Sequence, residues 1–180
     1  SCPTIFLCRC LALRQKKQYH DALEELANAI SLRPDYQFAY RLQVDIYTIL
    51  NQPNNVHLTL NKIIRINPSY APAYNQRGML QKDGGHFKEA IDDFSKAIEL
   101  APSMVEAYKN RAATYIQMKD HRNAVGDYAV ILQKTPNDQQ TLMRRAAAFE
   151  KLGEYNKASR DYSSAVKNNR DNENALLKRG

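Results

Sequence analysis

Cysteine is scarce in this 180-residue sequence, and its three copies, Cys2, Cys8 and Cys10, lie within the first ten residues. Cys8 and Cys10 are two positions apart on a predicted helix, so their side chains point to different faces and cannot form a disulfide with each other. No disulfide framework is implied, which fits a reducing compartment. We therefore expect an intracellular, cytoplasmic protein.

Long apolar runs and targeting signals are also missing. The apolar N-terminal stretch, residues 1–13, is too short and too interrupted to span a membrane. No basic segment precedes it, as one does in a signal peptide. The sequence predicts no membrane span.

Catalytic and metal-binding motifs are absent from the sequence. It contains no HExxH, no CxxC, no glycine-rich phosphate loop and no serine-centred elbow. The four histidines fall at unrelated places along the chain: His20, His57, His86 and His121. We expect no enzyme, no catalytic residue, no cofactor and no bound metal.

Charge leaves several classes of partner open. The net charge of +7 is compatible with nucleic acid, an acidic peptide or a membrane surface, but no run of five like charges occurs. Helical-repeat proteins that read nucleic acid need a base-reading pair at one fixed place in every repeat. The corresponding positions vary here, so we expect a protein or peptide partner and no nucleic acid.

The most regular feature that is present is a proline every 34 residues, at Pro34, Pro68, Pro102 and Pro136. Proline cannot continue a preceding helix. A helix-capping residue type follows each proline: Asp35, Ser69, Ser103 and Asn137. Because Asp, Ser and Asn accept hydrogen bonds from the first turn of a helix, this column predicts helix starts. A stop and a start at a fixed spacing indicate an array of helical repeats.

The period divides the chain into five blocks and a remainder. The blocks are 3–36, 37–70, 71–104, 105–138 and 139–172, and 173–180 begins a sixth helix pair or a cap. In the first block we expect helices at about 4–16 and 20–32. Small residues recur at the eighth, twentieth and twenty-seventh places, and large ones at the fourth and twenty-fourth. The second block is degenerate, with Val44, Val56 and Ile63 in the small columns.

These columns resemble the tetratricopeptide repeat family, whose 34-residue repeat has the same small and aromatic places. The segments "AYNQRG", "AYKNRAATY" and "GEYNKASRDY" are close to the family pattern, whereas Gln81 stands where an aromatic belongs and tryptophan is absent. The resemblance implies an all-α fold, a right-handed superhelical solenoid of helix-turn-helix repeats forming one array over 1–180. Since such arrays normally finish with a polar capping helix, we expect a fragment of a larger protein.

Arginine and a carboxylate recur together within the blocks. The seventh place is arginine and the twenty-third is acidic in four blocks, whereas Gln43 and Thr59 replace both in the second. We predict an Arg–carboxylate pair between the two helices of one repeat. The alternative, a pair with the arginine of the next repeat, would leave Glu25 facing Gln43.

The first-helix face opposite the packing positions lines the concave groove in this family, so the resemblance implies a peptide-binding surface there. The polar and methionine candidates on this face are Arg41, Asn75, Met79, Lys82, Lys109, Asn110, Met143, Arg144, Lys151 and Lys178. The same face also carries Phe38, Leu42, Ala113, Ile116, Gln140 and Ala147.

The sequence thus predicts a non-enzymatic protein-interaction scaffold that binds a peptide or partner segment along this groove. One alternative is an architectural spacer, whose groove is only a solvated face and whose open ends self-associate. Another is a chaperone-docking module with a degenerate carboxylate clamp. Only two of the five clamp positions match in either frame, and they are Asn110 with Arg144 or Lys109 with Lys178. A partial clamp of this kind favours an acidic ligand.

Overall fold

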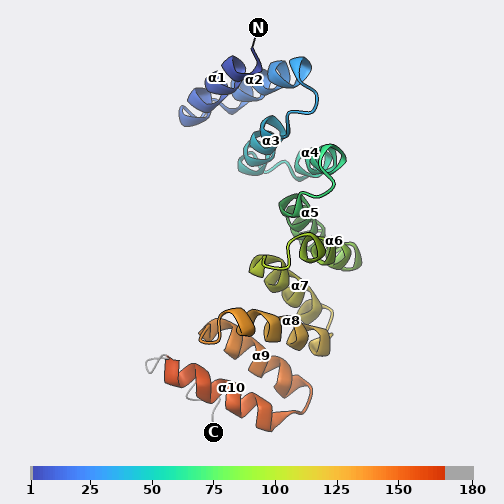
Figure 1. Ribbon diagram of the computed structural model, residues 1–180, viewed down its shortest axis with the longest axis vertical. Coiled ribbons are helices and arrows are strands. Elements are labelled where there is room, and N and C mark those ends of the chain that lie inside the picture. The colour runs from blue at the N-terminus through green and yellow to red at the C-terminus, as the bar shows by residue number, and fades with distance from the viewer. Residues whose placement is uncertain (1, 169–180) are drawn as a thin grey trace. The chain divides into compact units, whose positions relative to one another are not determined.

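The computed structural model describes residues 2–168, which form ten α-helices and no strand (Figure 1). The helices are α1 (Pro3–Gln15), α2 (Tyr19–Leu32), α3 (Gln37–Ile49), α4 (Pro53–Ile66), α5 (Ala71–Asp83), α6 (Phe87–Leu100), α7 (Val105–Gln117), α8 (His121–Lys134), α9 (Gln139–Lys151) and α10 (Tyr155–Asn168). The predicted all-α, helix-turn-helix repeat fold is confirmed.

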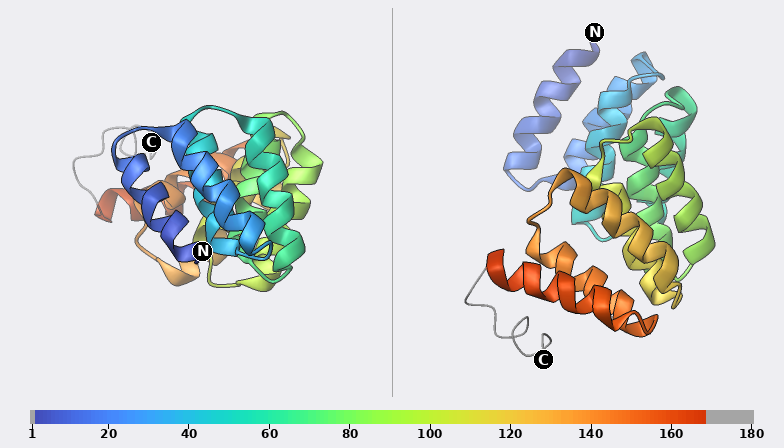
Figure 2. Two further views of the ribbon diagram at one scale, coloured as in Figure 1. Left: turned by 90° about the horizontal axis from the view of Figure 1, so that it is seen from above. Right: turned by 60° about the horizontal axis from the view of Figure 1, so that its bottom comes forward.

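The chain divides into two compact units, Ser1–Leu80 and Gln81–Gly180, with the boundary inside α5. In the first unit α1 packs on α2, α2 on α3, and α3 on α4. In the second, α6 packs on α7 and each later helix on the next, as Figure 2 shows for α9 (orange) and α10 (red). Within each unit, these successive helices therefore bury their apolar stripes against one another, as in other repeat proteins.

The turns between repeats correct one prediction. The polar residue after each proline lies inside a turn, and the helix begins two residues later, with Tyr36 as the N-cap of α3. The Tyr36 N–H donates to the Arg33 carbonyl (3.1 Å), which closes a β-turn. Proline suits the second position of such a turn because its φ is already set. The same bond recurs at Met104 and Asp138.

The turns within the repeats contain a residue with positive φ. Gly85 and Gly153 have φ of 81° and 75°, which is the left-handed region that glycine adopts without a steric cost. Lys119 takes the corresponding place in the fourth repeat, with φ 61°. Pro53 is the first residue of α4, where it displaces no helical hydrogen bond.

The small and large columns form the core. Alanines of the twentieth and twenty-seventh places are buried: Ala22, Ala29, Ala90, Ala97, Ala124, Ala158 and Ala165. Their large partners Leu26, Phe94, Tyr128 and Tyr162 are buried too. In the degenerate second repeat Val44, Val56 and Ile63 are also buried and pack with Leu60. The larger side chains at these three places therefore remain buried.

The predicted Arg–carboxylate pair is present in the first, fourth and fifth repeats. Arg111 donates from Nε and Nη2 to the two oxygens of Asp127 (2.9 and 2.6 Å). Arg145 grips Asp161 in the same way (2.7 and 2.8 Å). In the first repeat, Arg9 lies 3.8 Å from Glu25, and its side chain is 63% exposed. The pairs in the second unit are therefore tighter and drier than the one at Arg9.

The arginines also reach the preceding repeat, which the sequence analysis did not predict. Nη1 of Arg111 donates to Ser95 Oγ (2.9 Å) on α6, while Nε and Nη2 of the same side chain hold Asp127. Nη1 of Arg77 donates to Asn61 Oδ1 (2.7 Å) on α4. At Arg111, one guanidinium thus joins its own helix to the second helices of two successive repeats.

Removing one member of the buried pair should cost far more than removing one member of the exposed pair. Arg111→Ala strands the buried Asp127 carboxylate and should lower the free energy of unfolding by about 3–5 kcal/mol. A double-mutant cycle with Asp127→Ala, measured by urea denaturation, should give a coupling energy of about 1–3 kcal/mol. The matched Arg9→Ala and Glu25→Ala cycle should stay below about 1 kcal/mol. Equal coupling in the two cycles would contradict this assignment.

Tyr162 gives the fold a pH-dependent contribution. Its phenol is buried and donates to Glu150 Oε2 (3.1 Å), and burial with this carboxylate raises the pKa of Tyr162 to about 12. An unfolded tyrosine ionises near pH 10. Between about pH 10 and 12 the unfolded chain therefore loses a proton that the folded chain keeps, so rising pH favours unfolding.

Tyr162→Phe should flatten the fall in stability above pH 10, because its side chain has no proton to lose. The measurement is the urea midpoint at pH 9, 10 and 11 for the wild type and the variant. Tyr155→Phe, which changes an exposed ring, is the control and should follow the wild type. If Tyr162→Phe loses stability with pH as steeply as the wild type, the folded protein does not keep the Tyr162 proton above pH 10.

Candidate functional site

A cavity of about 300 Å³ is lined by side chains from α7, α8 and α9 of the second unit. These three helices are labelled in Figure 1. Its lining combines apolar side chains with two cations: Ala113, Ile116, His121, Tyr128, Arg144, Ala147, Ala148 and Lys151. Two cations around an apolar hollow can hold an apolar group and an acidic one together.

Helical spacing explains how this surface forms. Arg144, Ala147 and Lys151 are three and seven positions apart on α9, so they share one face. Ala113 and Ile116 are three apart on α7 and line the opposite side of the cavity. The short alanine side chains of Ala113 and Ala147 leave the space that larger residues would fill.

Tyr128 of α8 lines the cavity and is only 3% exposed. Burial raises the pKa of the Tyr128 phenol, and the positive charge and hydrogen bond of Arg144 oppose this rise. Arg144, an exposed residue of α9, therefore places its positive charge near the buried phenol. Its aliphatic stem can cover apolar surface while its charge stays accessible.

His121, the first residue of α8, also lines the cavity. Within residues 2–168, its buried Nδ1 has no hydrogen-bond partner. A buried polar atom without a partner costs about 1–3 kcal/mol. This nitrogen is a feature that a bound polar group can satisfy.

The predicted groove residues are brought together only in part. Arg144 and Lys151 share the cavity with Ala113, Ile116 and Ala147 from the same predicted face. The sequence analysis missed three lining residues, His121, Tyr128 and Ala148. Tyr128 occupies the twenty-fourth place of its block, one of the two places where large packing residues recur. It is buried as that place predicts, and it also lines the cavity. His121 carries no repeat signal that points to a site.

The other predicted groove residues of the second unit that the structure describes do not line this cavity. Lys109 Nζ lies 3.9 Å from Asp138, and Lys82 Nζ lies 3.4 Å from Asp83. Asn110 is half-buried, and Met143 packs against the cluster around Leu132 and Leu142. Lys178 lies outside the described residues.

Among the predicted groove residues of the first unit, Arg41 lies next to two aromatic rings and a cavity. Its guanidinium lies over the rings of Phe38 (5.9 Å) and Tyr70 (5.7 Å), beside a cavity of about 570 Å³. Asn75 is buried, at 8% exposure, and donates to Met79 Sδ (4.0 Å). Asn75 therefore contributes little to the exposed surface.

Residues 2–168 offer neither a metal site nor a membrane-spanning helix. No group of three or more His, Cys, Asp or Glu side chains there is arranged to hold a metal ion. No helix in that range is long and apolar enough to cross a membrane.

Comparison with known proteins agrees with the fold. Residues 71–104 match the family described as the tetratricopeptide repeat. A crystal structure of MamA superposes with a TM-score of 0.83 at 20% identity, covering 93% of this chain and 92% of that one. YrrB, described as a TPR protein with an unusual peptide-binding site, superposes at 0.78 with 16% identity, covering 96% and 89%. PilF of Pseudomonas aeruginosa superposes at 0.73 with 18% identity, covering 98% and 80%.

The hairpin array and its alanine columns define a helical-repeat protein. Residues 71–104 match the tetratricopeptide repeat, and the chain has the fold of the tetratricopeptide repeat protein that it superposes on.

The coupling between Arg144 and Tyr128 can be tested directly. Arg144→Gln removes a positive charge that favours the phenolate, so the pKa of Tyr128 should rise further. The measurement is the pH dependence of the Tyr128 ring carbon signal by NMR. Lys151→Gln removes the other cation at the cavity, which does not contribute to the Tyr128 shift, and should leave it in place. An unchanged or lower pKa in Arg144→Gln would exclude the contact.

Proposed function

We propose that this protein is a non-enzymatic protein-interaction module that binds an acidic peptide segment at the α7–α9 cavity. The observation that carries the proposal is the pairing of an apolar hollow with two cations, Arg144 and Lys151. An apolar side chain of the peptide enters the hollow, and a neighbouring carboxylate pairs with Arg144. Tetratricopeptide repeats generally serve as interaction modules, which supports the same function.

The energetics favour a localised site. A pocket of about 300 Å³ is at the small end of the range for ligand pockets, so it takes one side chain of the peptide. Burying an apolar side chain contributes about 1.5–3 kcal/mol. Arginine is enriched at the energetically dominant positions of interfaces, where it packs and pairs at once. Arg144 is placed for both tasks because its stem lines the hollow and its charge is exposed.

The distribution of cations does not favour a chaperone-type carboxylate clamp. Such a clamp needs several donors converging on one carboxylate. Lys109 lies 3.9 Å from Asp138. Asn110 is half-buried on α7 and does not line the cavity. The acidic group of the peptide is therefore held by Arg144 and Lys151. The cytoplasmic location and the self-association of the array remain predictions from the sequence.

Selection of random peptides displayed on phage against the purified chain tests this function. We expect enriched peptides that carry an apolar residue next to Asp or Glu. Ala147→Leu fills the hollow and Arg144→Glu reverses the charge at its rim, and each should weaken the binding of a selected peptide at least tenfold. Fluorescence anisotropy of the synthetic peptide gives the dissociation constants.

Arg160→Glu is the matched control, because Arg160 is exposed on α10 and lines none of the cavities described. It reverses one charge, as Arg144→Glu does, and should bind the peptide like the wild type. Circular dichroism confirms that each variant stays helical. If no peptide is enriched, or if all variants bind equally, the concave site is excluded and the architectural alternative is favoured.

A further inference from the structure

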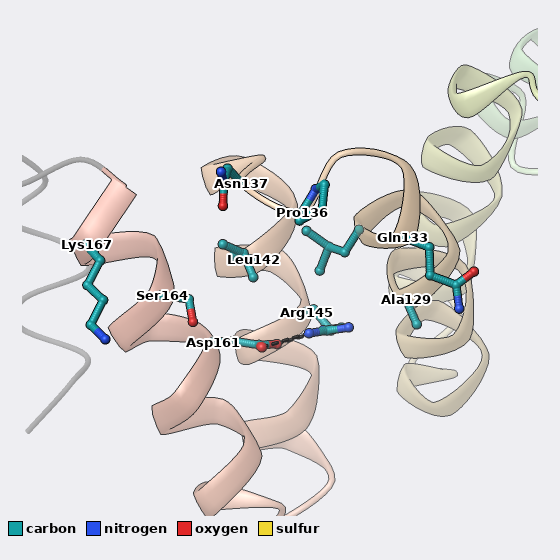
Figure 3. Close-up of a pocket in the computed structure, with 10 residues that line it drawn as sticks. Ala129, Gln133, Pro136, Asn137, Leu142, Arg145, Asp161, Ser164 and Lys167 are labelled. Carbon is teal, nitrogen blue, oxygen red and sulfur yellow. Dashed lines mark hydrogen bonds and ion pairs between the residues drawn. The ribbon is translucent and has the colours of Figure 1, made fainter.

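A second cavity of the second unit, of about 520 Å³, lies between α8, α9 and α10 (Figure 3). It shares no lining residue with the α7–α9 cavity. It is lined by apolar residues, amides, a hydroxyl and three charged groups: Ala129, Leu132, Gln133, Pro136, Asn137, Leu142, Arg145, Asp161, Ser164 and Lys167.

The repeat itself shows what is different at this place. The arginine at the seventh place of a repeat faces the residue sixteen positions earlier, on the second helix of the preceding repeat. That residue is Asn61 for Arg77 and Ser95 for Arg111, and each accepts a hydrogen bond from Nη1 of its arginine. Before Arg145 the same place is Ala129, whose methyl group accepts none. The third bond of this arginine is therefore missing at the α8–α9 junction.

Figure 3 shows the consequence for the guanidinium. Asp161 occupies one edge of the Arg145 side chain, through Nε and Nη2, and the other end points toward Ala129 and Gln133. Within residues 2–168, Nη1 of Arg145 has no hydrogen-bond partner like those of the two other arginines. An unmet guanidinium donor held rigidly by a carboxylate is prepared to bind an oxygen acceptor.

The surrounding charges and donors favour an anionic acceptor. Arg145 and Lys167 are two cations against the single carboxylate of Asp161, whose two oxygens already accept from Arg145. The amide of Asn137 adds a neutral donor to the lining, whereas Ser164 already donates its hydroxyl proton to the Arg160 carbonyl (3.0 Å). A carboxylate accepts several hydrogen bonds at once and is held more strongly by charged donors than a neutral oxygen is.

We propose that this cavity binds a carboxylate group, which takes the place that the Ser95 hydroxyl fills at Arg111. The carboxylate belongs either to a small organic acid or to an Asp or Glu side chain of a partner protein. This site is independent of the α7–α9 peptide site, so either can fail alone.

The experiment follows the Arg145 and Arg111 Nε–H signals of the 15N-labelled chain by NMR during titration with sodium acetate. Sodium chloride at the same ionic strength is the control for screening. We expect acetate to give a saturable shift of Arg145 that chloride does not reproduce. Arg111 has the same ion pair but a filled acceptor place, so its signal should not move.

Two variants separate the pocket from general charge effects. Ala129→Ser supplies the missing hydroxyl, and acetate should then bind at least tenfold more weakly. Lys167→Gln removes the second cation from an exposed position and should also weaken acetate binding. A linear, non-saturating shift of Arg145, an equal response of Arg111, or undiminished binding to Ala129→Ser would each overturn the proposal.

A second titration distinguishes the two sources of the carboxylate. The probe is a Gly-Glu-Gly tripeptide with an acetylated N-terminus and an amidated C-terminus, so that its side chain holds the only carboxylate. Tripeptide binding at least tenfold tighter than acetate binding, with the same loss in Ala129→Ser, indicates a partner protein. Equal affinity of the two probes indicates a small organic acid.

Discussion

The structure depends on close approach between helices that recur every 34 residues. Buried alanines such as Ala90 and Ala124 allow that approach, and side chains such as Phe94 and Tyr128 fill the space around it. Because helices within each unit pack on their neighbours along the chain, stability is spread over many similar contacts. A change at one repeat, such as the bulky residues of the second, is therefore absorbed locally.

Polar contacts add a second layer of connection between the repeats. Arg111 and Arg145 each hold a carboxylate in their own repeat, and Arg77 and Arg111 hold an acceptor in the repeat before. This bond crosses a junction that the apolar columns already close. A guanidinium is suited to this place because its donors are fixed in a plane and point in several directions. The substitution of Ala129 for an acceptor leaves the apolar packing in place and opens a polar cavity.

Both cavities of the second unit arise because a repeat position carries a smaller side chain than its geometry accommodates. Ala113 and Ala147 leave a hollow between α7 and α9, and Ala129 leaves one between α8 and α10. Cations line both, with Arg144 and Lys151 at the first and Arg145 and Lys167 at the second. The two linings differ in that the buried Tyr128 belongs to the first and the Arg145–Asp161 ion pair to the second.

The sequence by itself determined the helices, their pairing and the Arg–carboxylate pairs, because these follow from spacing within one repeat. Arg111 and Asp127 are sixteen residues apart on two helices joined by a short turn, so their encounter follows from the hairpin. Only the tertiary structure decided which exposed residues share a cavity. Arg144, Tyr128 and His121 line one cavity because α8 packs against α9. The periodic pattern indicated only Arg144 as a residue of a binding surface. The bond from Arg111 to Ser95 likewise needed coordinates, because it depends on how closely successive repeats pack and not on any residue pattern within one.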